Sequence, residues 1–371
     1  MKRTLIFIFS SATLVVAPLL AADSTAAPIT WSGFVDAYYN KNFNSPTTGT
    51  NSYRVFDVAD NQLAFGLAEL VVQKQASPVG FRMDLDYGPT NDVVQTGNVG
   101  TLNILQQAYL TAVLPIGSGL TVDVGKFVTH MGYEVIESKD NWNYSRSYLF
   151  GYAIPFFHTG IRLTYPVASV LSATVHVLNG WNSIIDNNHS KTLGLTLNWT
   201  ASSSTSVIFN GIDGFEQAFL APYGKRDVAD FIVTEAVNDN LSLALNADYG
   251  QERLGGSKGP LAIWKGAAVY GKYTLDPKSS VALRGEVYYD PFDYTTVFAY
   301  GTPTFPLPDP KLTLKEVTLT YEYHIFDPLI LRGELRDDFA NGAGLFNTAS
   351  STPSSSVKSQ PTFLIGVIAV F

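Results

Sequence analysis

The stretch VGFRMDLDYG, residues 79–88, separates apolar from polar side chains with a period of two. Its odd positions carry the apolar side chains Val79, Phe81, Met83, Leu85 and Tyr87. Its even positions carry Gly80, Arg82, Asp84, Asp86 and Gly88. Because successive side chains of a β-strand point to opposite faces, this stretch predicts a strand with one greasy face and one charged face.

The same alternation returns along the chain, in 192–199, 241–250, 281–290 and 331–338 among other stretches. Short linkers and long linkers alternate between these stretches. Bilayer hydrocarbon offers no partner to an unpaired backbone N–H or C=O, so strands cross it only as a closed barrel, with short periplasmic turns and long external loops. The pattern therefore predicts an all-β fold, a transmembrane antiparallel up-and-down β-barrel.

A soluble sandwich also alternates, and two further features favour the membrane. Lysine is scarce in the expected strands, where carboxylates and guanidiniums stand between small residues, as in a wet lumen. Residues 363–371 form an apolar stretch that ends on Phe371 and resembles the terminal signature by which outer-membrane barrels are recognised for insertion. We therefore predict Phe371 as an insertion signal, with outer-membrane lipid and the barrel-assembly machinery as partners.

We expect about sixteen strands, with fourteen to eighteen allowed. An even number keeps both termini on the periplasmic side, and barrels of this size leave an aqueous channel. The expected strands are 30–41, 61–74, 79–88, 103–114, 119–128, 158–166, 170–180, 191–200, 205–213, 227–238, 241–251, 261–275, 279–290, 311–325, 329–338 and 360–371. The expected long loops are 42–60, 89–102, 128–157, 214–226, 291–310 and 339–359.

The first residues are typical of an export signal. Lys2 and Arg3 precede an apolar core from Leu5 to Leu20, and small residues follow it. This predicts a secretory signal peptide over residues 1–27, cleaved between about residues 21 and 27, and a single barrel domain over 28–371. Loss of Lys2 and Arg3 takes the formal charge from −8 to −10, which gives no basic surface for nucleic acid. With no cysteine, disulfides and thiolate metal sites are excluded.

The loop 128–157 is the predicted functional segment, because it is too long and too aromatic for a solvated connector. As the third long loop, it is expected to fold into the barrel and narrow it, as in sixteen-stranded porins. Its acidic side chains would then face arginines of the wall and create a transverse field. A lid packed outside the lumen is the alternative. The candidate constriction residues are Glu134, Glu137, Lys139, Asp140 and Arg146.

Charged residues on the polar faces of the strands are expected to line the pore. They carry both signs, so the ion preference stays open. The candidate wall residues are Arg82, Asp84, Asp86, Asp123, Arg162, Asp248, Arg284, Glu286, Arg332, Glu334, Arg336 and Asp338. Asp84 and Asp86 share a face and offer a cation site, although lining a wet pore is the favoured interpretation.

Residues 141–162, NWNYSRSYLFGYAIPFFHTGIR, are similar to the hallmark of the OmpL-like family of β-barrel porins. Val124-Gly125-Lys126-Phe127 and residues 178–182 fit the same pattern. The resemblance covers most of the chain after the signal peptide. It implies an outer-membrane porin-like protein of Gram-negative bacteria, in a family whose solutes are mostly undefined.

We expect passive diffusion of small hydrophilic solutes, without cofactor, metal or energy coupling. The chain has five histidines, His130, His158, His176, His189 and His324, but no G-x-S-x-G or H-E-x-x-H motif, so no catalytic residue is predicted. A barrel that acts as an adhesin or structural protein through loops 291–310 and 339–359 is the alternative from another class, and an outer-membrane enzyme is a further, less favoured alternative. A homo-oligomer is also a candidate state.

Overall fold

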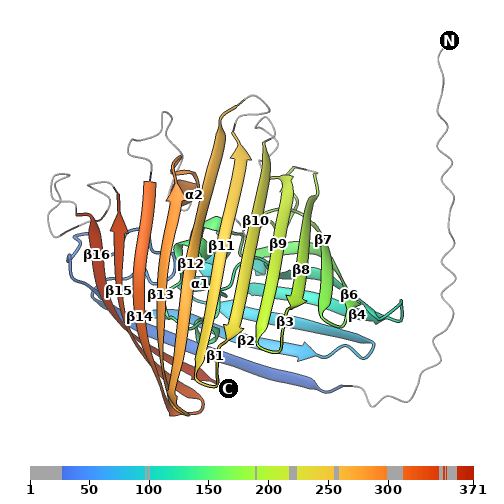
Figure 1. Ribbon diagram of the computed structural model, residues 1–371, viewed down its shortest axis with the longest axis horizontal. Helices are drawn as coiled ribbons and strands as arrows, with labels where there is room; N and C mark the ends of the chain where they lie inside the picture. Colours follow the sequence, from blue (N-terminus) through green and yellow to red (C-terminus); the bar gives the residue numbers. More distant parts are fainter. Residues whose placement is uncertain are drawn as a thin grey trace.

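A computed structural model describes residues 27–96, 98, 101–188, 190–216, 224–254, 259–298, 312–341, 346, 348 and 357–371. Within these residues the chain forms a closed barrel of sixteen antiparallel strands, each paired with its neighbours in sequence (Figure 1). The predicted fold class and number of strands are confirmed. The expected signal peptide lies outside the described residues, apart from its last position, as does most of loops 291–310 and 339–359.

The strands begin and end within a few residues of the predicted positions. They are β1 (Ile29–Asn42), β2 (Gln62–Lys74), β3 (Val79–Tyr87), β4 (Leu105–Leu114), β5 (Leu120–Val128), β6 (Phe157–Ala168), β7 (Leu171–Leu178), β8 (Thr192–Thr200), β9 (Thr205–Phe215), β10 (Lys225–Ala236), β11 (Leu241–Arg253), β12 (Leu261–Asp276), β13 (Ser279–Asp290), β14 (Leu312–Phe326), β15 (Leu329–Ala340) and β16 (Ser359–Val370).

The few helical segments lie in the long connections. They are the α-helices α1 (Pro89–Val94) and α2 (Tyr294–Phe298), the 3₁₀ helices η1 (Thr101–Ile104) and η2 (Ser138–Asp140), and the π-helix η3 (Leu149–Ala153). Among the described residues, none of these helices has the length and apolar character of a membrane span.

Alternation along each strand separates the lumen from the lipid. On β14, Thr318 and Thr320 are buried on the inner side, whereas Val317 and Leu319 expose about half of their side chains outward. This is the period of two that the sequence predicts. The wall is uneven in height, because β7 has 8 residues and β12 has 16.

The barrel closes where β1 pairs with β16. Gly33 and Phe371 exchange two backbone hydrogen bonds, of 3.1 Å and 3.0 Å, at the end of this seam. A Cβ atom on Gly33 would lie 2.2 Å from the carbonyl oxygen of Glu69 and 2.6 Å from the ring of Phe371. The closure therefore requires a residue without a side chain at position 33. A role of Phe371 in recognition during insertion stays a prediction.

We expect Gly33→Ala to lower the free energy of unfolding by about 1–3 kcal/mol, since overpacking forces the backbone of β1 or β2 to shift. Gly333→Ala on β15 is the matched control, because its Cβ would meet no heavy atom within 4 Å. The measurement is urea unfolding of the refolded barrel, followed by heat-modifiable mobility on gels. Equal stability of the two variants would contradict this account of the seam.

Candidate pore constriction

The connection from β5 to β6, residues 129–156, lies inside the barrel. It leaves the wall at β5, yet its backbone contacts strands on the far side of the lumen. The N–H groups of Tyr144 and Ser145 donate to the carboxylate of Glu334 on β15, at 2.7 Å and 3.1 Å. Those of Tyr148 and Leu149 donate to Glu286 on β13, at 2.7 Å and 2.6 Å. We call this segment the constriction loop.

Other strands hold the two ends of the constriction loop. The N–H of Gly132 donates to Asp230 on β10 at 3.0 Å, and the N–H of Tyr133 donates to Asn246 on β11 at 3.1 Å. The indole of Trp264 on β12 donates to the carbonyl of Ala153 at 3.0 Å. The alternative of a lid packed outside the lumen does not match these contacts.

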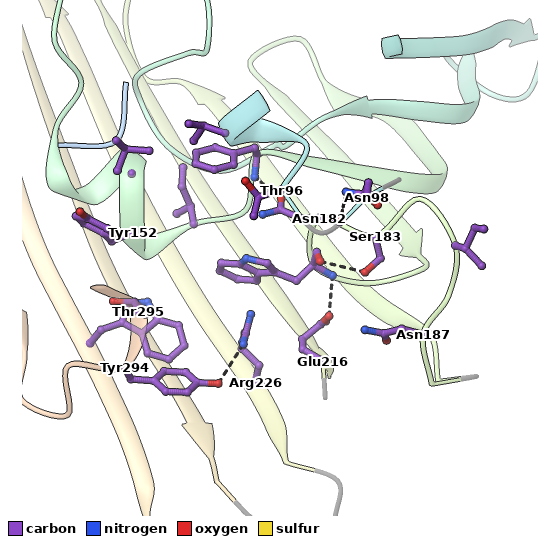
Figure 2. Close-up of a pocket in the computed structure, with 18 of the residues that line it drawn as sticks. Thr96, Asn98, Tyr152, Asn182, Ser183, Asn187, Glu216, Arg226, Tyr294 and Thr295 are labelled. Carbon is purple, nitrogen blue, oxygen red and sulfur yellow. Dashed lines mark hydrogen bonds between the residues drawn. The ribbon is translucent and has the colours of Figure 1, made fainter. Parts of the chain in front are cut away.

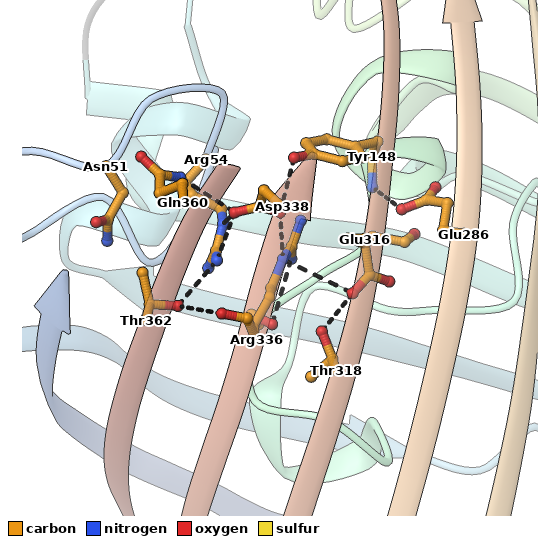
Figure 3. A network of polar contacts seen from close by, with 12 residues as sticks. Asn51, Arg54, Tyr148, Glu286, Glu316, Thr318, Arg336, Asp338, Gln360 and Thr362 are labelled. Atoms are coloured by element: carbon orange, nitrogen blue, oxygen red, sulfur yellow. Dashed lines mark hydrogen bonds and ion pairs between the residues drawn. The ribbon is translucent and has the colours of Figure 1, made fainter. Parts of the chain in front are cut away.

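Arginines of the wall are buried beneath the constriction loop and bind its carbonyl groups. Arg284 donates to Glu316 and to the carbonyl of Ser145, both at 2.6 Å. Arg336 donates to Asp338 and to the carbonyl of Arg146, both at 2.7 Å. Figure 3 shows Arg336 beside the carboxylates of Asp338 and Glu316. Buried guanidiniums are stable only when paired and fully hydrogen-bonded, and here the loop backbone supplies part of that pairing.

The same network includes the connection from β1 to β2, in which the sequence predicted a long loop but no site residue. Arg54 in that connection is buried and pairs with Asp338 at 2.7 Å (Figure 3). It also pairs with Asp57 in its own loop. The carboxylate of Asp338 thus accepts hydrogen bonds from Arg54, Arg336 and the hydroxyl of Tyr148, the last at 2.7 Å. A lone charge in a polar loop has no periodic signal that would have predicted this role.

Glu316 and Glu322 of β14 are also missing from the wall residues predicted from the sequence. Glu316 pairs with Arg284 at 2.6 Å, and Glu322 pairs with Arg332 at 2.6 Å. Both stand on the buried side of β14 with Thr318 and Thr320 between them. Their spacing of two therefore carried a signal that would have placed them in the wall.

The predicted constriction residues fall into different environments. Glu134 is buried and pairs with Arg284 of the wall at 2.6 Å, which is the expected arrangement. Glu137 instead lies within electrostatic reach of the carboxylates Glu69 and Asp86. Burial raises the pKa of Glu137, and the nearby charge of Asp140 raises it further. The predicted opposition of an acidic loop and an arginine wall therefore applies to Glu134 and not to Glu137.

The remaining members of that set act within the loop itself. Lys139 pairs with the neighbouring Asp140, whose side chain is half exposed. Arg146 is buried, donates to the carbonyls of Tyr144 and Ile136, and lies 5.1 Å from the ring of Phe56. Its guanidinium shapes the loop from within and does not point into open lumen.

Every predicted wall residue lies on the inner side, but few of them are open to water. Arg284, Arg332 and Arg336 expose 0%, 1% and 3% of their surface, because the constriction loop covers them. Arg82, paired with Asp84 at 2.9 Å, keeps 33% of its side chain exposed. Arg162, paired with Asp123 at 2.7 Å, keeps 24%. Among the predicted wall residues, the charges that stay partly exposed therefore lie on β3, β5 and β6.

Three histidines cluster at the start of the constriction loop. The ring of His130 stacks on His176 with centroids 4.0 Å apart and lies 5.5 Å from His158. His158 is buried between the hydroxyl of Thr129 and the carbonyl of Gly180. Over the described ranges, no three His, Asp or Glu side chains are arranged to hold a metal ion.

Comparison with known proteins now gives the family. The profile of the family described as "Putative beta-barrel porin-2, OmpL-like" matches residues 28–371. This chain belongs to that family. The resemblance carried by residues 141–162 is thereby confirmed, and the barrel is a porin-type barrel of the Gram-negative outer membrane.

Solved outer-membrane proteins share the fold of this porin at low identity. The outer membrane channel DcaP of Acinetobacter baumannii has a TM-score of 0.60 and 13% identity, over 93% of this chain and 98% of that chain. OmpT of Vibrio cholerae, in trimer form, has a TM-score of 0.59 and 12% identity, over 93% of this chain and 100% of that chain. An anion-selective porin from Comamonas acidovorans has a TM-score of 0.57 and 11% identity, over 93% of this chain and 99% of that chain. No curated protein sequence matches the chain.

We expect Arg284→Met to release the constriction loop of this porin. Glu134 and Glu316 would lose their shared cation, and breaking a buried ion pair from one side costs about 3–5 kcal/mol. Single-channel conductance should rise, and the loop should become sensitive to protease. Arg82→Met, on the open wall, is the control that should leave the loop protected. Unchanged conductance and protection in Arg284→Met would count against this anchoring.

The histidine cluster predicts a pH dependence of stability. Burial lowers the pKa of His130 to about 4, against a value of about 6.5 in an unfolded chain. Between these values the unfolded chain binds a proton that the native protein does not, so the free energy of unfolding decreases as the pH falls, by up to about 3 kcal/mol. Unfolding midpoints from pH 7 to 4.5 should separate the native protein from His130→Gln. Parallel curves would refute the assignment.

Proposed function

We propose that this porin is a passive channel for small polar solutes, with residues 129–156 as its constriction. The main support is the way in which the loop is held. Carboxylates on β13 and β15 accept its N–H groups, and guanidiniums on β13 and β15 bind its carbonyls. A segment fixed from both sides narrows the lumen permanently and does not act as a mobile plug.

The charges that solutes would meet follow from the same geometry. The arginines under the loop are paired and covered, so they contribute little field to the open lumen. Arg82 and Arg162 are the partly exposed guanidiniums of the wall opposite, and each is accompanied by a carboxylate. Focused fields at such a site bias the passage of ions and orient polar solutes.

The test is planar-bilayer recording of the refolded chain, with reversal potentials measured in a salt gradient. Stable open steps are expected, and the double variant Arg82→Gln with Arg162→Gln should shift the permeability ratio toward cations, because two positive charges leave the narrow region. Lys315→Gln serves as the control, since it also removes a positive charge but Lys315 is exposed on the outer side of β14. A correctly folded barrel that never opens would overturn the proposed channel.

A further inference from the structure

A cavity of about 560 Å³ lies between the constriction loop and the other long connections. It stands on the external side, because its lining comes from the long connections and the adjoining strand ends. Residues of the connections 43–61, 88–104, 129–156 and 179–191 meet there with α2 and the starts of β10 and β12. This volume lies within the range of small-molecule sites and suits a solute of one or two sugar rings.

One side of the cavity is aromatic. Tyr152, Trp181, Trp264 and Tyr294 reach it from four separate segments. Figure 2 shows Tyr152 and Tyr294 together on one side. Trp264 is fully buried with its ring 5.9 Å from that of Tyr294, so it supports the aromatic side from behind. Aromatic faces carry negative charge density and favour contact with polarised C–H groups.

The opposite side carries amides and hydroxyls, among them Asn98, Ser183 and Asn187 (Figure 2). Asn182 is locked, since its Oδ1 accepts the N–H of Phe156 at 2.6 Å. Asn187 differs, because its Oδ1 is buried without a hydrogen-bond partner among the described residues. A buried acceptor left without a partner costs free energy unless a ligand or water supplies the donor.

The charged groups at the base of the cavity, one guanidinium and two carboxylates, are hydrogen-bonded within the protein. Arg226 pairs with Glu252 at 2.6 Å, and its guanidinium lies 4.5 Å from the ring of Trp181. Glu216 accepts the N–H of Trp181 and the hydroxyl of Thr192, each at 2.6 Å. No lysine lines the cavity within the described residues. The site therefore offers no uncompensated cation to an acid, and both oxygens of Glu216 already accept hydrogen bonds from the protein, so the site suits an uncharged ligand.

We propose that this cavity binds a neutral carbohydrate of one or two sugar rings at the external entrance of the channel. A sugar ring combines an apolar C–H face for the aromatic side with hydroxyl groups for the amide side. This inference rests on the proposed function, because the bound sugar would lie directly on the external side of the constriction. It adds a solute class to a channel whose solute was undefined.

The test uses the full chain in detergent and in planar bilayers, with glucose, maltose and sucrose as probes. Succinate and lysine serve as charged comparisons. We expect a saturable change in tryptophan fluorescence and a saturable reduction of current with at least one neutral sugar, and neither effect with the charged solutes. Trp181→Ala and Asn187→Ala should raise the half-saturating concentration at least tenfold.

Trp199→Ala is the matched control, because Trp199 lies on β8 with 48% of its surface exposed on the outer side. It should bind sugar as the native protein does. If conductance is normal but no sugar alters fluorescence or current, the carbohydrate site is overturned and the channel stands. If succinate or lysine binds instead, the ligand class is overturned. If sugar binds in detergent to a barrel that never conducts, the channel fails and the site stands.

Discussion

In hydrocarbon, every backbone N–H and C=O of the wall needs a partner within the protein, and the rest of this structure depends on that constraint. It forces the sheet to close, so β16 must find β1 across the whole length of the chain. The seam ends at the paired backbones of Gly33 and Phe371, where a Cβ would not fit. Closure then defines an interior, and the charged side chains that anchor the constriction loop are directed into it.

A second constraint acts inside the barrel, where buried charges are costly without partners. The wall and the constriction loop satisfy each other: Glu286 and Glu334 accept loop N–H groups, while Arg284 and Arg336 donate to loop carbonyls. Neither partner would be stable alone in this geometry. Buried rings such as Tyr148 and Phe150 add packing to the same contact, so the loop resembles part of a globular core.

Different strands of the interior hold the constriction loop and face the open lumen. The strands β13 to β15 carry charges that hold the loop, and β3, β5 and β6 carry the pairs of Arg82 and Arg162, which remain partly exposed. Above the loop, the aromatic and amide sides of the external cavity face one another. In the proposed channel a solute would meet that cavity first and the charged narrow region next, so recognition and ion preference would be properties of different residues.

The sequence by itself determined the strands, their number and the side on which each charge lies, because a period of two and turn length are local properties. It also predicted Glu286 on the wall and Glu134 in the loop that faces it, and in the structure both carboxylates are buried. The tertiary structure decided which inward charges are covered. Arg332 and Arg82 look alike in their strands, yet the path of the constriction loop covers the first and leaves the second partly exposed. That path depends on contacts such as Arg54 with Asp338, 284 positions apart in the chain, and no local pattern records them.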